Sequence, residues 1–392
     1  LCIFSQSWWR TGLHRTLLTM LAIALASIAP VSSAVQTSTA PVSFAVQTSI
    51  ASQSSQVPFS IKHRRYVSVA STESIQTVLD SLPNDDNWAL ITLGPGVFQQ
   101  QLFIRRGKTI LSGSGKEQTV LRFGILREHF LKSKQADKSE TNSAALPRGD
   151  ALEQDWGAAV VNIAASDIVL LDMTVQNSYA IEHPTDPKRF GHQFAIRGFQ
   201  SATRILTDHV NFVTNGADTV SLWNKTNGMY YHANGRFTGR VDLMCPRGTA
   251  YITHSEFVTL QAVATLWHDG ERSPDHKIVV SHSRFLGVNG FELGRHHYDG
   301  QFYLLHNRFS QAMSDTPIYR RTYPKEPWRD QPNRYGARYY FFGNHVDSGK
   351  QYQWLRDNID AEHAHNITAD WTFQGAWQPE VLLGQIRQSF LL

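Results

Sequence analysis

The chain has 392 residues, of which 41% are hydrophobic and 18% are charged, and its formal net charge is +4. This composition indicates a globular protein with a large core, in one long domain or two ordinary ones. Two cysteines, Cys2 and Cys245, are too few for a disulfide framework. The small positive charge gives no reason to expect a nucleic-acid partner.

Residues 1–34 have the pattern of a secretory signal peptide. Two arginines precede an apolar run at 17–28, and small residues at 32–34 fit a cleavage site after Ala34. The run is shorter than the roughly 20 apolar residues that cross a bilayer. We therefore expect a secreted or periplasmic protein with no membrane partner after cleavage. Cleavage would also remove Cys2, so the core would have to stabilise the fold without an internal disulfide.

Residues 35–58 are predicted to form a disordered linker. They are rich in Ser, Thr, Ala and Gln, and the sequence AVQTS occurs twice between 34 and 49. Such a stretch has too little large apolar surface to offset the entropy lost on ordering. The folded catalytic domain is therefore expected at 59–392.

The first folded element is predicted to be a short helix. In Ser74–Leu82, SIQTVLDSL, the apolar residues fall on one face, and Pro83 follows as a stop signal. The rest of the chain reads as short β-strands, such as WALITLGPGVF and AAVVNIAASDIVLLDMTVQNS, separated by Gly, Asn, Asp and Ser.

A weak repeat runs through these strands. Four segments place a His before a Phe: TDHVNF, THSEF, SHSRF and LHNRF. Their Phe residues, at 212, 257, 285 and 309, are separated by 45, 28 and 24 positions. Irregular spacings of this size favour the coils of a β-helix over a strictly periodic array. The Phe residues should then stack inside, and the His residues should form an outward or turn ladder rather than a converging metal site.

Several segments, taken in order from about residue 60 to 380, resemble the pectin methylesterase family, particularly its bacterial members. They include SIQTVLDSLPNDDNWALITLGPGVFQQQLFI, KTILSGSGKEQTVL, GHQFAIRG, GADTVSLW, GRVDLMCPRGTAYITHSEF, ELGRHHY, QYQWLRDNID and ITADWTFQGAWQPE. The resemblance implies an all-β fold, a single-stranded right-handed parallel β-helix with a short N-terminal helix cap. It also implies a carboxylic ester hydrolase, an aspartyl esterase of the pectinesterase type that modifies cell-wall pectin.

Matched position by position, the resemblance implies four catalytic residues. Asp242 would be the nucleophile, Asp218 the general acid and base, Arg295 the cation beside the nucleophile and Gln193 an oxyanion-hole amide. Hydrolysis of a methyl ester through an acyl-enzyme needs these roles, and two aspartates can divide them if their environments separate their pKa values.

Each of these residues also has a structural interpretation. Asp218 follows Asn-Gly-Ala and is on spacing alone a turn residue. Asp242 lies in an apolar strand, where a carboxylate is costly unless paired, and a salt bridge with Arg295 or Arg240 would satisfy it. Gln193 is on its own a satisfied strand residue, and Arg295 a surface arginine.

The chain departs from the family pattern where substrate should bind. Ala217 replaces the glutamine before the acid–base aspartate, which removes one oxyanion-hole amide. The segment 243–246, LMCP, replaces two aromatic rings and introduces Cys245, for which an alternative role as nucleophile has no local base signature. His296 and His297 replace Pro-Trp, as cleft residues or as exposed loop residues.

We therefore expect an esterase core with an altered substrate cleft. Sugar-binding candidates are His297, His296, Trp223 and Tyr231, and the aromatic residues are equally consistent with packing. The expected partner is a pectin-like polysaccharide, and we expect no cofactor, no metal and a monomer. Alternatives are a polysaccharide-binding β-helix protein with impaired catalysis, or an esterase or thioesterase for another acyl group. A polysaccharide lyase is disfavoured because no acidic cluster of calcium type is visible.

Overall fold

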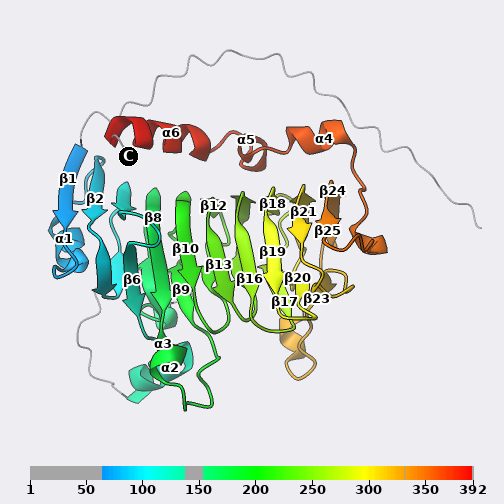
Figure 1. Ribbon diagram of the computed structural model, residues 1–392, viewed down its shortest axis with the longest axis horizontal. Helices are drawn as coiled ribbons and strands as arrows, with labels where there is room; N and C mark the ends of the chain where they lie inside the picture. The colour runs from blue at the N-terminus through cyan, green and yellow to red at the C-terminus, as the bar shows by residue number, and fades with distance from the viewer. Residues whose placement is uncertain (1–63, 137–152, 331, 391–392) are drawn as a thin grey trace, which may run out of the picture. The chain divides into compact units, whose positions relative to one another are not determined.

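The computed structural model describes residues 64–136, 153–330 and 332–390. Its strands pair in parallel and wind the chain into successive coils, so the fold is the all-β parallel β-helix that the sequence predicts (Figure 1). The expected signal peptide at 1–34 and linker at 35–58 lie outside the described residues. No helix in the described part of the chain is long and apolar enough to cross a membrane.

Three ladders of parallel strands form the walls of the coils. The first contains β1 (Arg64–Val69), β2 (Trp88–Leu93), β5 (Thr109–Ser112), β8 (Ile168–Asn177), β10 (Ile205–Val213), β12 (Met229–Ala233), β15 (Thr249–Thr253), β18 (Ile278–Ser281), β21 (Gln301–Leu305) and β24 (Arg338–Phe342). The second shares the long strands β8 and β10 and adds β3 (Gly96–Gln99), β6 (Thr119–Phe123), β13 (Arg236–Gly239), β16 (Glu256–Thr259), β19 (Arg284–Gly287), β22 (Arg308–Phe309) and β25 (His345–Val346). The third, a separate sheet, contains β4 (Leu102–Ile104), β7 (Ala159–Ile163), β9 (Phe194–Gly198), β11 (Val220–Leu222), β14 (Met244–Pro246), β17 (Ala264–His268), β20 (Glu292–His296) and β23 (Tyr319–Arg320).

A column of stacked phenylalanine rings forms part of the interior of the coils. Phe212, Phe237, Phe257, Phe285 and Phe309 are fully buried, one on each of five consecutive coils. Consecutive ring centroids are 5.6, 5.0, 4.5 and 4.9 Å apart. The predicted internal Phe stack is therefore confirmed, and Phe237 joins it although its coil lacks the His-x-x-Phe pattern.

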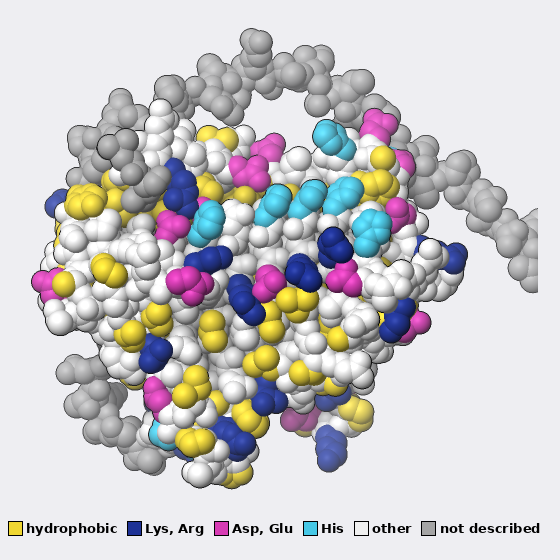
Figure 2. All heavy atoms as spheres, viewed as in Figure 1, with side chains coloured by type: hydrophobic (Ala, Val, Ile, Leu, Met, Phe, Trp, Pro, Cys, Tyr) yellow, Lys and Arg dark blue, Asp and Glu magenta, His cyan; other side chains and the backbone are white. Residues whose placement is uncertain are grey.

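A row of left-handed residues borders this column on the outside. Asp172, His209, Asn234, His254, His282 and His306 follow aligned strand positions and have φ between 49° and 55°. Asp, Asn and His are enriched in this conformation, which explains their choice here. The three last rings stack with centroids 5.2 and 5.0 Å apart, which confirms the predicted ladder, and a row of histidines crosses the face in Figure 2.

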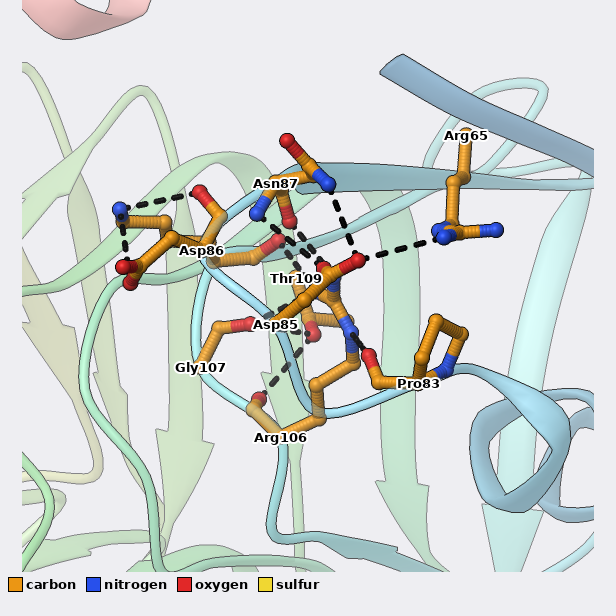
Figure 3. A network of polar contacts seen from close by, with 9 residues as sticks. Arg65, Pro83, Asp85, Asp86, Asn87, Arg106, Gly107 and Thr109 are labelled. Carbon is orange, nitrogen blue, oxygen red and sulfur yellow. Dashed lines mark hydrogen bonds and ion pairs between the residues drawn. The ribbon is translucent and has the colours of Figure 1, made fainter. Parts of the chain in front are cut away.

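The N-terminal end is closed by the predicted helix and by a polar network. Helix α1 (Ile75–Ser81) begins at Ser74, whose hydroxyl accepts from the Thr77 amide at 3.1 Å. Next to it, the buried Arg106 donates to Pro83 O and forms an ion pair with Asp85 at 2.8 Å (Figure 3). The Asn87 side chain, by its hydrogen bond, lowers the pKa of Asp85 to about 2.

The remaining helices lie outside the coils. They are α2 (Arg127–Ala136), α3 (Tyr179–Glu182), α4 (Ala361–Asn366), α5 (Ala369–Thr372) and α6 (Pro379–Phe390), with short 3₁₀ turns at Glu153–Asp155, Pro327–Arg329 and Gln353–Leu355. Helices α4 to α6 run back along the coils towards β1 (Figure 1). Arg387 of α6 forms ion pairs with Asp208 at 2.5 Å and Asp172 at 3.3 Å, which ties this last segment to the first ladder.

Candidate active site

The third sheet brings three of the predicted catalytic residues to one level of consecutive coils. Parallel bridges join His192 to Ala217 and Ala217 to Val241. Gln193, Asp218 and Asp242 each follow one of these bridge residues, so they form a row across three coils. The two aspartates are 24 positions apart in the sequence, and the bridges place them on adjacent coils.

Both aspartates have a left-handed backbone. The φ angle is 61° at Asp218 and 53° at Asp242. For a residue other than glycine this conformation is uncommon, although aspartate tolerates it better than most. The same left-handed conformation is repeated at aligned positions of two adjacent coils. A turn conformation at Asp218 is compatible with a catalytic role for the same residue.

Arg295 of β20 forms a two-bond ion pair with Asp242. The Nε atom donates to Oδ1 at 3.1 Å and Nη2 donates to Oδ2 at 2.7 Å. Asp242 is only 5% exposed. Burial raises the pKa of Asp242 to about 6, against the opposing effect of the Arg295 guanidinium and with a further contribution from the Asp218 charge. Arg240, the other partner considered, instead donates to Asn215 at 3.1 Å.

Gln193 lies in the row but its side chain already has protein partners. It is fully buried, its Nε2 donates to the carbonyl oxygen of Arg189, and its Oε1 accepts from the Asn215 amide at 3.4 Å. A primary amide has two N–H groups, so one of them is committed to Arg189. Ala217 precedes Asp218 and offers no side-chain donor, as the sequence indicates.

Trp223 and His297 lie near the acidic row. The guanidinium carbon of Arg247 is 4.0 Å from the centroid of the Trp223 ring, and the Arg247 side chain also contacts Cys245 beside Asp218. The His297 ring lies 6.3 Å from Trp267, whose ring is 5.4 Å from the Arg295 guanidinium carbon. His297 is 5% exposed, so it is a packed residue and not the exposed loop histidine considered above.

His296 and Tyr231 are not brought to the site's surface. His296 is 1% exposed, its Nε2 lies 2.9 Å from the Tyr339 hydroxyl, and burial lowers its pKa to about 4. Tyr231 belongs to β12 in the first ladder, where it stacks on Tyr251 and its hydroxyl donates to Glu380 of α6 at 3.2 Å. Sugar stacking by Tyr231 does not fit this position beneath α6.

The sequence did not lead us to expect two buried arginines near the site. Arg197 of β9 and Arg247 both contact Trp223, with guanidinium carbons 4.6 and 4.0 Å from its ring centroid. Arg197 pairs with Asp155 at 2.6 Å, and Arg247 lies 3.4 Å from Asp269. The only signal in the sequence was an arginine within or just after an apolar strand, where a charge needs a partner.

The fold and this acidic pair define a class of protein, the parallel β-helix proteins with two aspartates and an arginine on one sheet. Solved structures of this shape include the pectin methylesterase of Erwinia chrysanthemi, with a TM-score of 0.60 and 16% identity over 80% of this chain and 98% of that one. The carrot pectin methylesterase has a TM-score of 0.59 and 13% identity over 81% and 95%. A pectin methylesterase in complex with a hexasaccharide has a TM-score of 0.58 and 15% identity over 80% and 98%.

These similarities show that the chain has the fold of pectin methylesterases, in a divergent sequence. No protein-family model matches the sequence, and no curated protein matches it significantly. Within the described residues, no group of three or more His, Cys, Asp or Glu side chains is arranged to hold a metal ion.

Proposed function

We propose that this protein is a secreted carbohydrate esterase that hydrolyses methyl esters of galacturonan through an aspartyl acyl-enzyme. The observation that carries the proposal is the buried Asp242–Arg295 pair beside Asp218, on the sheet that the fold shares with pectin methylesterases. Nothing in the mechanism needs a cofactor. The substrate class rests on the names of the similar structures, one of which holds a hexasaccharide.

In the first half of the reaction, ionised Asp242 attacks the ester carbonyl carbon. A carbon–oxygen bond forms, and the electron pair of the carbonyl moves onto its oxygen to give a tetrahedral intermediate. Asp218, in its protonated form, gives its proton to the methoxy oxygen as that carbon–oxygen bond breaks. Methanol leaves, and the acyl group stays on Asp242 as an anhydride.

In the second half, Asp218 is a carboxylate and acts as a base. It takes a proton from a water molecule while the water oxygen attacks the acyl carbon. The bond to Asp242 breaks and returns it to the carboxylate, the product leaves as a carboxylic acid that then loses its proton to solvent, and both aspartates are again in their starting states. Arg295 holds Asp242 in place and favours its ionised form, which is the form that attacks.

The direct test is release of methanol from highly methylated galacturonan by the purified chain. The proposal expects turnover in the parent protein and none above background in Asp242→Asn or Asp218→Asn. Turnover that survives in both variants would reject the aspartyl mechanism. A panel of acetylated polysaccharides and acyl thioesters tests the alternative that the altered site takes another acyl substrate.

A second candidate is a polysaccharide-binding protein with impaired catalysis. Two observations favour it. Ala217 has no side-chain amide, and one side-chain N–H of Gln193 already donates to the carbonyl oxygen of Arg189. Restoring a donor with Ala217→Gln should raise kcat about tenfold or more if the oxyanion hole is incomplete, since one such donor is worth roughly a hundredfold where it is well aligned. Binding of pectin without turnover, in the parent and in Ala217→Gln, would favour this candidate.

A further inference from the structure

The thiol of Cys245 lies between a catalytic carboxylate and a buried cation. Its Sγ is 3.8 Å from Asp218 Oδ2 and 3.3 Å from Arg247 Nη1. Cys245 is 2% exposed and lies in β14, three residues after Asp242. Of the two cysteines in the sequence, it is the one within the described residues.

The chemistry of the partners fixes the direction of both contacts. A guanidinium has no acceptor, so Arg247 donates and the sulfur accepts. Burial raises the pKa of the Cys245 thiol, so the group keeps its hydrogen. That hydrogen is available to Asp218 Oδ2, an oxygen that accepts. A buried protonated thiol is a poor nucleophile, and this disfavours the alternative role of Cys245 as the attacking group.

The Arg247 side chain is held in place by contacts with three other side chains. Its Nε lies 3.4 Å from Asp269 Oδ2, and its guanidinium carbon lies 4.0 Å from the Trp223 centroid and 5.6 Å from that of Trp267. Arg247 is 6% exposed. A cation fixed in this way gives the Cys245 sulfur a defined position, because the sulfur must stay within reach of Nη1.

We propose that Cys245 and Arg247 are positioning residues for Asp218. The thiol donates its hydrogen bond to Oδ2 of Asp218. The carboxyl proton that passes to the departing alcohol therefore resides on Oδ1 of Asp218. Arg247 orients the thiol and does not touch the substrate. Neither residue forms a covalent bond in the reaction. This inference rests on the proposed function for its catalytic meaning, but the contacts themselves can be tested without turnover.

The kinetic test compares Cys245→Ala and Cys245→Ser with the parent. Cys245→Ala should lower kcat about tenfold, the cost of roughly one hydrogen bond, with KM changed less than about twofold. Cys245→Ser keeps a donor and should recover kcat to within about threefold. An unchanged kcat in folded Cys245→Ala, or a kcat in Cys245→Ser no higher than in Cys245→Ala, would overturn the proposal.

A spectroscopic test separates this proposal from the esterase function. In a Cys2→Ser background Cys245 is the single thiol, and its S–H stretching band reports its hydrogen bonds. Asp218→Asn and Arg247→Met should each shift that band. Asp167→Asn, which removes the partner of Arg204 in an ion pair just before β8, should not. A band that stays at the parent frequency in Asp218→Asn would overturn the contact. If the band shifts but the parent hydrolyses no ester, the pairing stands and the proposed function fails.

Discussion

Two aspartate–arginine pairs in this protein have nearly the same local geometry and different surroundings. Asp167 and Arg204 form two bonds, at 2.6 and 2.7 Å, and Asp167 has φ of 62°. Asp242 and Arg295 form two bonds, at 3.1 and 2.7 Å, with φ of 53° at the aspartate. The aspartate side chain is 19% exposed in the first pair and 7% exposed in the second.

The comparison indicates that a left-handed aspartate with a two-bond arginine does not by itself distinguish the candidate site. The Asp167 pair lies just before β8 and holds one turn to the start of β10, which is a structural task. Around Asp242 the coils add a second carboxylate, Asp218, and deeper burial, and together these raise the pKa of Asp242. A carboxylate whose pKa is raised to about 6 is still mostly ionised at neutral pH and is more basic than an ordinary one, which suits a group that attacks as the carboxylate.

The largest expected effect is that of Asp242→Asn. It should reduce the rate of methanol release by about 10⁴-fold or more, as expected for loss of a nucleophile. Asparagine tolerates the left-handed backbone, so the fold should be retained. Asp167→Asn is the matched control, since it removes the same pair chemistry outside the site and should leave kcat within about twofold. An equal loss of methanol release in the two variants would contradict a special role for the Asp242–Arg295 pair.

The second test replaces the arginine of each pair. Arg295→Met should lower kcat/KM by about a hundred- to a thousandfold, because Asp242 loses the charge that favours its ionised form. Arg204→Met should leave kcat/KM unchanged and lower the free energy of unfolding by about 1 kcal/mol, the range of a partly exposed pair. The measurements are steady-state kinetics and urea unfolding of both variants. A loss of activity in Arg204→Met without unfolding would contradict the assignment.

The pH dependence sharpens the comparison further. Asp242 attacks as the carboxylate, and burial raises its pKa to about 6, so kcat/KM should increase with pH through about 6 and fall about tenfold per unit below it. In Arg295→Met the midpoint should move to higher pH, because the opposing cation is gone. In Arg204→Met the midpoint should stay. A profile that is flat between pH 4 and pH 7 would reject ionised Asp242 as the group that limits the rate.

The smallest effect is expected at an exposed left-handed position. His282 has φ of 49° and stacks between His254 and His306, without a second carboxylate or an arginine in its ring contacts. His282→Asn keeps a residue that suits the backbone, so the free energy of unfolding should change by less than about 0.5 kcal/mol. Methanol release should be unchanged. A change above this size, measured by urea unfolding, would show that the ring stack carries part of the stability.

Much of the fold followed from short-range features of the sequence. The spacings between Phe212, Phe257, Phe285 and Phe309 predicted internal stacking, because each coil contributes one ring to the column. Ser74 predicted the start of α1, since its hydroxyl caps the helix. The cap acts within one turn, and the Phe residues recur from coil to coil, so both features leave a pattern that a single sequence shows.

The candidate site was less accessible to sequence reasoning. Asp218, Asp242, Arg295 and Gln193 came from the resemblance, and the register of the third sheet aligns the first two with the glutamine. Tyr231 was expected in the cleft, but its partner is Glu380, 149 residues later in the chain. No local pattern reveals such a contact.

The same limit applies to His296 and Arg247. The position of His296 depends on Tyr339, which the coil that ends in β24 brings beside it. Arg247 acquires its neighbours Trp223 and Asp269 only when three coils stack. Residues whose role depends on packing between coils are therefore the ones that sequence reasoning missed.

The strand ladders also separate two properties of this protein: the spacing of the candidate reacting groups and the sequence of the loops beside them. The distances between Asp218, Asp242 and Arg295 are set by backbone pairing in the third sheet. The aromatic residue Tyr323 and its partner Asp330 lie between β23 and β24, on a long excursion from the ladders. Such a loop can change in length or sequence while the reacting groups keep their spacing. A protein of this design can therefore change the residues that its loops present while Asp218, Asp242 and Arg295 keep their spacing.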